Sequence, residues 1–105
     1  MSGLGEMGNL LKQAQEMQRL LDSARAELRG RAIEGSAAGG FVRILLSADR
    51  HEVKGVHIAP GVNLEARALE EAIAAALRDA LRRASEAEKE AIGRITGGMN
   101  LPGLL

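Results

Sequence analysis

Positively charged side chains are the groups in this sequence with the clearest potential for chemistry. Eleven of the fourteen cations are arginines, and the planar guanidinium group offers several hydrogen-bond donors to one phosphate. Most of these cations fall on two segments whose apolar spacing predicts helices. The residues that we single out as candidate phosphate-binding groups are Lys12, Arg19, Arg25, Arg29, Arg78, Arg82, Arg83, Lys89 and Arg94.

The spacing of the cations on the first segment favours an exposed basic ridge. Lys12 and Arg19 are seven residues apart on the side opposite the apolar residues, which places them about 10 Å apart along a helix. Arg25 and Arg29 are four residues apart, a spacing at which like charges repel slightly. The alternative, which the residues alone favour, is a solvated surface where Glu16 and Asp22 pair with Lys12, Arg19 and Arg25.

Carboxylates also accompany the cations of the second segment. Asp79 precedes Arg82 and Arg83 by three and four residues, and Glu90 precedes Arg94 by four. These are the spacings at which side chains meet on a helix surface. Exposed pairs of this kind contribute only a few tenths of a kcal/mol, so phosphate contacts could replace them at little cost. A charge-paired solvated face is the simpler interpretation here as well.

The groups needed for catalysis or metal binding do not converge. His51 and His57 are six residues apart, and we expect His57 to share the strand face of Val53. The chain has no cysteine and no zinc-binding or nucleophile motif. We therefore predict no enzymatic activity, no catalytic or cofactor-binding residue, no metal and no small-molecule substrate.

The small-residue run Gly35–Gly40 resembles a phosphate cradle only superficially. Such a cradle joins a strand to a helix whose first amides face the phosphate. Here the run leads into another apolar strand pattern, and no lysine follows it directly. We therefore interpret residues 35–40 as a hairpin loop.

Composition limits the range of functions further. The chain has 105 residues, which favours one domain, and its formal net charge is zero. A strongly basic balance is the usual mark of nucleic-acid binding, so any phosphate surface has to arise from local arrangement. No apolar run approaches a membrane span and no signal-like N-terminus is visible. We expect a cytoplasmic protein with no membrane partner.

Apolar spacing predicts an α+β domain over residues 1–105. Residues 7 to 28 carry apolar side chains at alternating spacings of three and four, which predicts a helix over 8–29 that ends at Gly30. Strands are predicted over 31–35, 40–47 and 52–58. A long helix follows over 64–95, with Asn63 as its N-cap, and a mobile tail over 96–105. The expected fold has two layers, in the order α-β-β-β-α, with a three-stranded antiparallel sheet and long helical arms.

The middle strand predicts a second subunit. Val42, Ile44 and Leu46 share one face, whereas Phe41 and Leu45 share the other. Both faces then carry substantial apolar surface, and one helical layer covers only one of them. We therefore expect a homodimer.

Three stretches, in order, resemble the YbaB/EbfC family. Residues 8–18, Gly-Asn-Leu-Leu-Lys-Gln-Ala-Gln-Glu-Met-Gln, resemble its first-helix signature. Residues 74–83 resemble its alanine-rich second helix, and residues 98–102, Gly-Met-Asn-Leu-Pro, resemble its closing motif. Two positions depart from the pattern: Arg78 stands where the family usually has Asn, and the second turn, 47–51, lacks the usual glycine.

The resemblance implies a nucleoid-associated homodimer that binds double-stranded DNA with little sequence preference through paired helical arms. Lys12, Arg82 and Arg83 match the basic positions of the family motifs. The alternative hypothesis is a protein-interaction module whose arms grip a protein partner, with DNA binding incidental. Zero net charge and the apolar C-terminal residues favour that alternative.

Overall fold

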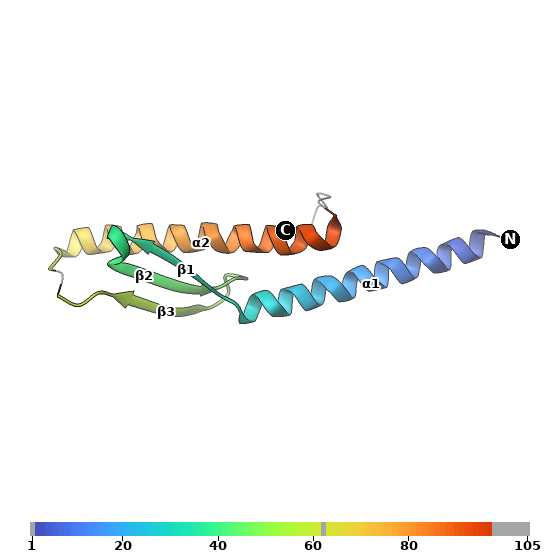
Figure 1. Cartoon of the computed structure of the whole chain (residues 1–105), viewed down its shortest axis with the longest axis horizontal. Helices are drawn as coiled ribbons and strands as arrows, with labels where there is room; N and C mark the ends of the chain where they lie inside the picture. Colours follow the sequence, from blue (N-terminus) through green and yellow to red (C-terminus); the bar gives the residue numbers. More distant parts are fainter. Residues whose placement is uncertain (1, 62, 98–105) are drawn as a thin grey trace.

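The chain folds into two long helices and a small sheet (Figure 1). The structure is a computed structural model that describes residues 2–61 and 63–97. Its elements in chain order are α1 (Ser2–Gly30), β1 (Ala32–Ala37), a short 3-10 helix (Ala38–Gly40), β2 (Val42–Ser47), β3 (Val53–Ile58) and α2 (Ala66–Thr96). The strands form an antiparallel sheet in the order β1-β2-β3. This arrangement confirms the α+β class and the predicted element order.

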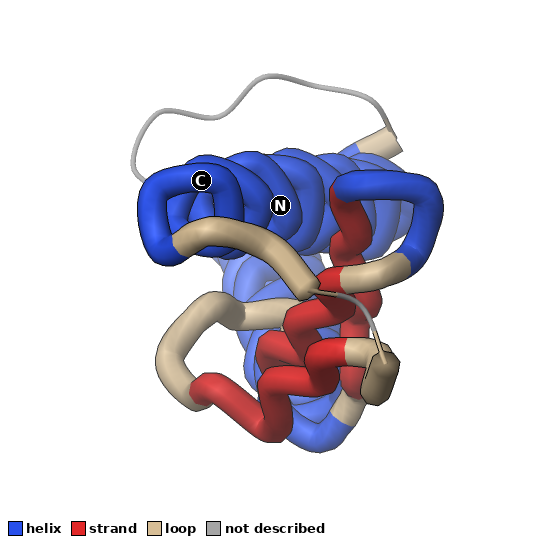
Figure 2. The backbone as a smooth tube through the Cα atoms, turned by 90° about the vertical axis from the view of Figure 1, so that its left-hand side faces the viewer, coloured by secondary structure: helices blue, strands red, loops and turns tan. Residues whose placement is uncertain are grey.

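Helix α2 lies across one face of the sheet, which gives the two layers seen end-on in Figure 2. It packs mainly on β1 and β2. The contact is made by a stripe of small side chains spaced three or four residues apart, namely Ala72, Ala76, Ala80, Ala84 and Ala87. Alanine at these positions lets the helix backbone come close to the strands. At the closest point the helix meets Gly35 of β1, which has no side chain to obstruct it.

A compact apolar core lies between α2 and the first two strands. Val42, Ile44 and Leu46 of β2 are almost fully buried, and they pack with Ala76 and Ala80 of α2. Phe41 belongs to this same core. The prediction that Phe41 lies on the opposite face of the sheet was therefore wrong. Phe41 belongs to the turn before β2 rather than to the strand, so strand alternation does not govern its direction.

The far face of the sheet is polar, contrary to the prediction that both faces are apolar. Glu34 and Arg43 form an ion pair of 3.6 Å there, and Leu45, which lies opposite Glu34, is only half-buried. Exposed apolar side chains occur instead on β3, where Val56 and Ile58 lie opposite Ile44 and Val42 of the core. Helix α2 does not extend over β3, so this strand keeps an uncovered apolar strip on the helix side.

A bulge in β3 changes which residues share its faces. The pairing register shifts between Leu45 and Leu46, so that one extra residue, Lys54, is accommodated in β3. As a result Val53 pairs with Leu46, on the face of Val56, whereas His57 pairs with Arg43. The predicted sharing of a face by His57 and Val53 was wrong because simple alternation does not anticipate a bulge.

Several predicted boundaries also shift. Helix α1 begins at Ser2 rather than residue 8, because the apolar spacing continues outward through Leu4 despite three glycines. Strand β1 continues to Ala37, since Ser36 and Ala37 pair with β2. Half of the predicted loop 35–40 is thus strand, and the reversal is confined to the left-handed residues 38–40. Strands β2 and β3 begin at Val42 and Val53, one or two residues later than predicted.

Helix α2 spans Ala66–Thr96 instead of 64–95. Asn63 is not its N-cap: Glu65 occupies that position with extended backbone and no side-chain hydrogen bond. At the other end Gly97 adopts a left-handed conformation with φ of 66°, and its amide donates to the carbonyl of Gly93. Such a conformation favours glycine. The predicted tail over 96–105 lies, from residue 98 onward, outside the described residues.

Helix α1 extends far from the sheet. Its C-terminal end is fixed by the amide of Ala48, which donates to the carbonyls of Leu28 and Arg31. Its N-terminal half continues past the end of α2 (Figure 1). The molecule consequently measures 76 × 21 × 16 Å.

Replacing Gly35 by Ala tests how closely α2 approaches β1. A Cβ at Gly35 would lie 2.2 Å from the Ala80 nitrogen and 2.5 Å from the Ala76 oxygen, both backbone atoms. We expect Gly35→Ala to lower the free energy of unfolding by about 3 kcal/mol, the upper part of the usual cost of overpacking.

Thermal and urea unfolding followed by circular dichroism at 222 nm measures this loss. Gly8→Ala is the control, because a Cβ there meets nothing within 4 Å and alanine favours a helix. Equal stability of Gly35→Ala and the wild type would contradict the observed packing.

Candidate nucleic-acid interface

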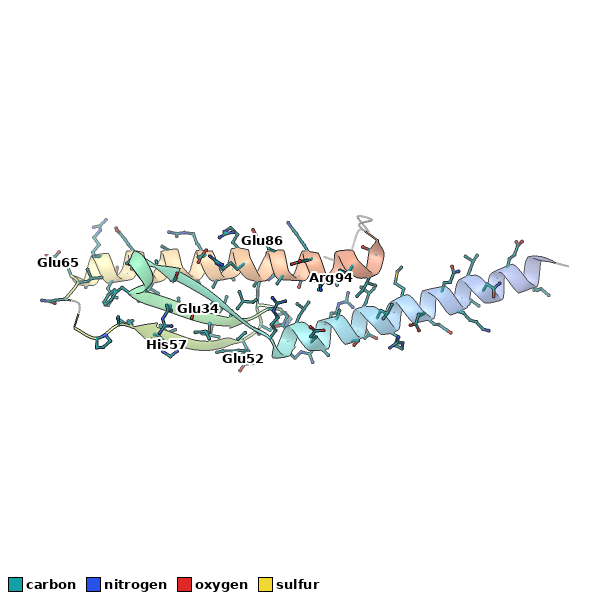
Figure 3. All side chains as sticks on the ribbon, viewed as in Figure 1. Glu34, Glu52, His57, Glu65, Glu86 and Arg94 are labelled. Carbon is teal, nitrogen blue, oxygen red and sulfur yellow. The ribbon has the colours of Figure 1, made fainter. Side chains whose placement is uncertain are left out.

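All nine candidate phosphate-binding residues are exposed to solvent on the two helices. Four lie on α1 and five on α2, the last of them Arg94 near the helix end (Figure 3). They do not form one compact cluster within the chain. The structure therefore distributes the candidate cations over two helices and does not gather them at a single basic site.

Six of the nine candidates have a carboxylate partner. On α1, Arg19 pairs with Glu16, Arg25 with Asp22 at 3.9 Å, and Arg29 with Asp49 at 3.7 Å. On α2, Arg82 and Arg83 both pair with Asp79, and Arg94 pairs with Glu90 at 3.3 Å. All of these pairs except Arg29–Asp49 were expected from helical spacing, whereas the expected partner of Lys12 is not observed among the described residues. They also reduce the positive charge that these six side chains present.

Asp79 is the centre of the strongest of these networks. Its Oδ2 accepts a hydrogen bond of 3.0 Å from the backbone amide of Ser36 in β1. Arg82 Nη2 donates to Oδ1 at 2.9 Å and Arg83 Nε donates to Oδ2 at 3.1 Å. The Ser36 amide, followed by the two arginines, holds the pKa of Asp79 below its ordinary value. Arg82 and Arg83 thus help to attach α2 to the sheet edge.

Three candidates have no ion pair within the described part of the chain: Lys12, Arg78 and Lys89. Arg78 and Lys89 are eleven residues apart, close to three helical turns, so they lie on the same face of α2 about 16 Å apart. Arg82 lies between them but is bound to Asp79 and Glu86. Phosphate can approach the three unpaired cations without displacing a carboxylate.

The comparisons with known proteins identify the class to which these helices belong. The model of the YbaB/EbfC DNA-binding family matches residues 3–99. The chain belongs to the YbaB/EbfC DNA-binding family. The fold also matches the crystal structure of an uncharacterized protein, HP0035, from Helicobacter pylori, with a TM-score of 0.71 and 17% identity over 89% of this chain and 96% of that chain. At that identity the match shows a shared fold alone.

Membership of the YbaB/EbfC family confirms the sequence resemblance and makes this a nucleoid-associated DNA-binding protein, outside the known enzyme families. Arg78, where the sequence departs from the usual family residue, is one of the unpaired cations. This departure adds a free positive charge to the outer surface of α2.

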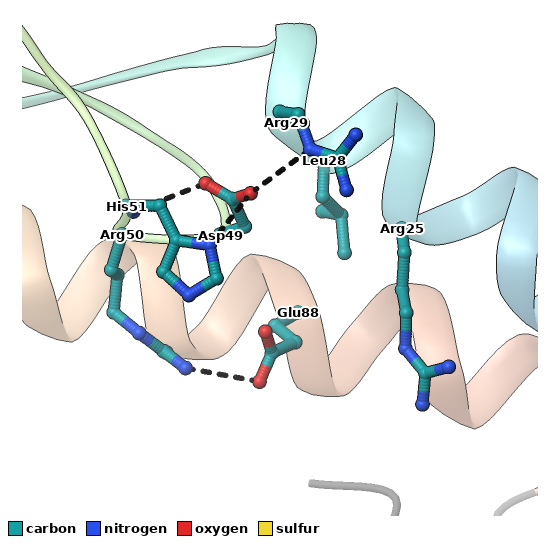
Figure 4. A pocket seen from close by; sticks show the side chains of 7 residues that line it. All are labelled: Arg25, Leu28, Arg29, Asp49, Arg50, His51 and Glu88. Carbon is teal, nitrogen blue, oxygen red and sulfur yellow. Dashed lines mark hydrogen bonds and ion pairs between the residues drawn. The ribbon is translucent and has the colours of Figure 1, made fainter.

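A cleft at the base of α1 gathers further charged groups (Figure 4). It has a volume of about 300 Å³ and is lined by Arg25, Leu28, Arg29, Asp49, Arg50, His51 and Glu88. Arg50 adopts a left-handed backbone conformation with φ of 65°, and its guanidinium bonds Ser85 at 2.7 Å and Glu88 at 3.1 Å. This contact ties the β2–β3 turn to α2. Arg29, through Asp49, ties α1 to the same turn.

The Ser47 hydroxyl donates a hydrogen bond of 2.6 Å to the Asp49 carboxylate. This hydrogen bond is the main reason why the pKa of Asp49 lies below its ordinary value. His51 Nδ1 lies 3.4 Å from the same carboxylate. Arg29 and Arg50 are thus engaged in joining the β2–β3 turn to α1 and to α2. The cleft therefore connects structural elements and is not an open anion-binding site.

Sequence reasoning missed three informative cations. Arg31 and Lys54 have no ion pair among the described residues, and Arg50 makes the contact across the cleft. Only the position of Arg50 beside Asp49 in a turn could have suggested its role. Over residues 2–61 and 63–97, no cluster of three or more His, Asp or Glu side chains could hold a metal ion. No helix in those ranges is both long and apolar enough for a bilayer.

Replacing Asp79 by Asn tests the network between α2 and β1. The folded-state pKa of Asp79 lies below its ordinary value of 3.8. Ionised Asp79 therefore stabilises the fold above that value, and this stabilisation disappears as the pH falls through the folded-state pKa. We expect Asp79→Asn to be less stable than wild type at pH 7, with the difference shrinking below about pH 4.

Urea unfolding at several pH values between 2.5 and 7 measures this difference. Glu86→Gln is the matched control, because it removes an exposed carboxylate from the same Arg82 without affecting β1. We expect it to change the free energy of unfolding little. A stability difference for Asp79→Asn that stayed constant down to pH 2.5 would refute the role assigned to its charge.

Proposed function

We propose that the protein binds duplex DNA at the bacterial nucleoid, in the cytoplasm, through contacts between helix cations and backbone phosphates, with little sequence preference. The observation that supports this proposal is that three exposed cations on the two helices, Lys12, Arg78 and Lys89, have no carboxylate partner among the described residues. Contacts to phosphate position a protein on DNA but carry no sequence information. Both helices contribute, so α1 and α2 act as basic arms.

The six carboxylate-paired candidates contribute in a second way. Each of the exposed pairs is weak, so an arginine can exchange its carboxylate for a phosphate when DNA arrives. Arg82 and Arg83 exchange least readily, because Asp79 is also held by the Ser36 amide. Net charge near zero keeps single-site affinity low. Binding therefore strengthens when many molecules share one DNA.

The scarcity of aromatic residues favours double-stranded over single-stranded DNA as the ligand. Proteins that hold single strands stack bases on exposed aromatic rings. The only aromatic side chain, Phe41, is buried in the core of this protein. Base stacking on the protein surface is therefore not available to support single-strand binding.

The exposed apolar strip of β3 supports a homodimer. Val53, Val56 and Ile58 are all exposed on the helix side of the sheet. Leu77 and Leu81 of α2 are also exposed. They lie on the same helix face as Glu88, which binds Arg50 of the β2–β3 turn. These residues leave apolar surface exposed on β3 and on α2. A second copy that covers this apolar surface would bury it and bring the basic arms of two chains together.

Replacing Val56 by Asp tests the dimer. An unpaired charge in an apolar interface is costly, so we expect sedimentation of the variant at the 11.1 kDa monomer mass and of the wild type at twice that mass. The helical signal at 222 nm should persist, because Val56 lies outside the core. Leu11→Asp, an exposed apolar residue of α1, is the control and should remain dimeric. A wild type that sediments as a monomer at micromolar concentration would contradict the dimer.

Two double variants with equal charge change test the phosphate contacts. Arg78→Gln with Lys89→Gln removes two unpaired cations, whereas Arg82→Gln with Arg94→Gln removes two paired ones. We expect the first pair to weaken DNA binding several-fold and to lower the slope of log affinity against log salt by about 0.9 for each lost contact. The second pair should change both quantities less.

Electrophoretic mobility shift with unrelated duplexes at four salt concentrations measures both variants. Equal losses for the two pairs would mean that net charge alone, and not unpaired side chains, determines the affinity. No retention of wild type at low salt would favour the second candidate function, a protein-interaction module. The exposed apolar residues on the N-terminal half of α1 are the observation in favour of that candidate.

A further inference from the structure

Helix α2 carries a third cation in line with Arg78 and Lys89. Arg67 precedes Arg78 by eleven residues, the same number that separates Arg78 from Lys89. Eleven residues make three helical turns to within about 20°, so the three cations lie on one side of the helix. All three side chains are exposed, and we call them the cation row. The row is about 33 Å long at the α-helical rise per residue.

The cation row faces away from the sheet. Helix α2 meets the strands through the alanine stripe that includes Ala76 and Ala80. Arg78 follows Ala76 by two residues, which turns its side chain by about 200° to the opposite side of the helix. Helix α2 runs along one side of the sheet (Figure 1). The three strands therefore lie behind the row and leave it open.

Short side chains separate the cations of the row. Ala74 lies on this side of the helix between Arg67 and Arg78. Ser85 lies on it between Arg78 and Lys89. Short side chains at these two positions let a broad surface come close to the helix and meet the three longer cations together.

Arg67 is available to an external anion. Its one ion pair is with Glu71, at 3.7 Å, and the two side chains are 89% and 75% exposed. An exposed pair of this kind is weak, so phosphate can replace the carboxylate. Helix stability does not account for a cation at this position, because Arg67 lies in the first turn of α2, where the helix dipole disfavours positive charge.

The length of the cation row matches one turn of duplex DNA, which is about 34 Å. A helix that lies outside the duplex and parallel to its axis meets the backbone of one strand at both ends of such a row. The backbone of the second strand crosses between them.

We propose that α2 lies along the duplex in this way. Arg67 and Lys89 then contact one strand and Arg78 contacts the other, so that Arg67 is a further phosphate-binding residue. The inference rests on the DNA binding proposed above, to which it adds the orientation of α2 and the contact by Arg67.

Exchanging Arg67 with its neighbour Ala68 tests the position of the cation. Arg67→Ala combined with Ala68→Arg leaves the composition and net charge unchanged but moves the guanidinium group by about 100° around the helix. Both positions are exposed, so the circular dichroism at 222 nm should not change. Arg67→Lys, which keeps a cation in the row, is the matched control.

We expect the exchange to weaken binding to a long duplex several-fold and to lower the slope of log affinity against log salt by about 0.9, for one lost contact. Arg67→Lys should bind like the wild type. Mobility shift at several salt concentrations measures both quantities. Equal binding by the exchanged variant and the wild type would overturn the inference and leave DNA binding intact. A wild type that binds no DNA would overturn both.

Removing the carboxylate beside the row tests it in the opposite direction. Glu71→Gln should strengthen DNA binding several-fold, because it releases Arg67 and removes a negative charge that faces the duplex. Glu70→Gln makes the same change of charge about 100° away around the helix and is the matched control. Equal gains for the two variants would mean that net charge alone acts, which contradicts the inference.

The length of the duplex tests the orientation of α2. A hairpin stem of about six base pairs covers roughly half a turn, so Arg67 and Lys89 cannot contact it together. On this stem Arg67→Gln should bind as well as the wild type, because Arg78 and Lys89 remain available. On a stem of about two turns it should bind several-fold more weakly. An equal loss on both stems would overturn the placement of α2 along the duplex.

Discussion

The backbone contact between α2 and β1 at Gly35 is the constraint on which the rest of the structure depends. The helix lies so close to the strand that a single Cβ at Gly35 would overlap with backbone atoms of Ala76 and Ala80. Only small side chains fit along this line, which explains the alanine stripe of α2. The close approach also brings Asp79 within hydrogen-bonding distance of the Ser36 amide. A contact between two backbones thus determines both the core and the charge network at its edge.

A core of this kind buries little apolar surface, and this limit determines which apolar side chains remain exposed. Alanine buries little apolar area, and α2 reaches only two of the three strands. Apolar residues are consequently left uncovered on β3 and along the outer half of α1. The same narrow shape gives the cations a large exposed helix surface relative to the mass of the chain. The surfaces that we propose for association and for phosphate therefore have one physical origin.

Much of the fold could be predicted from periodicity, since the two helices, the three strands and their order along the chain all follow from local patterns. Other features depend on tertiary contacts that local patterns do not encode. The bulge at Lys54 reverses the expected face of Val53, and Phe41 turns into the core because it precedes the strand. Among the candidate cations, helical spacing correctly anticipated the partners of Arg82, Arg83 and Arg94. It could not reveal that β1 holds Asp79, or that Arg50 crosses from a turn to α2.

Because α1 extends far beyond the sheet, a small rotation at its base moves its N-terminal half over a large distance. Lys12 lies nineteen residues before Arg31, which is about 28 Å along the helix axis from the joint with the sheet. A rotation of about 10° at that joint displaces the Lys12 ammonium by about 5 Å, more than the 3.4 Å rise between successive phosphates of one strand. In the mode of DNA binding that we propose, small bends at the base of α1 would let Lys12 meet phosphates across grooves of different width. Such an arm would engage many local geometries of the double helix without a matched register.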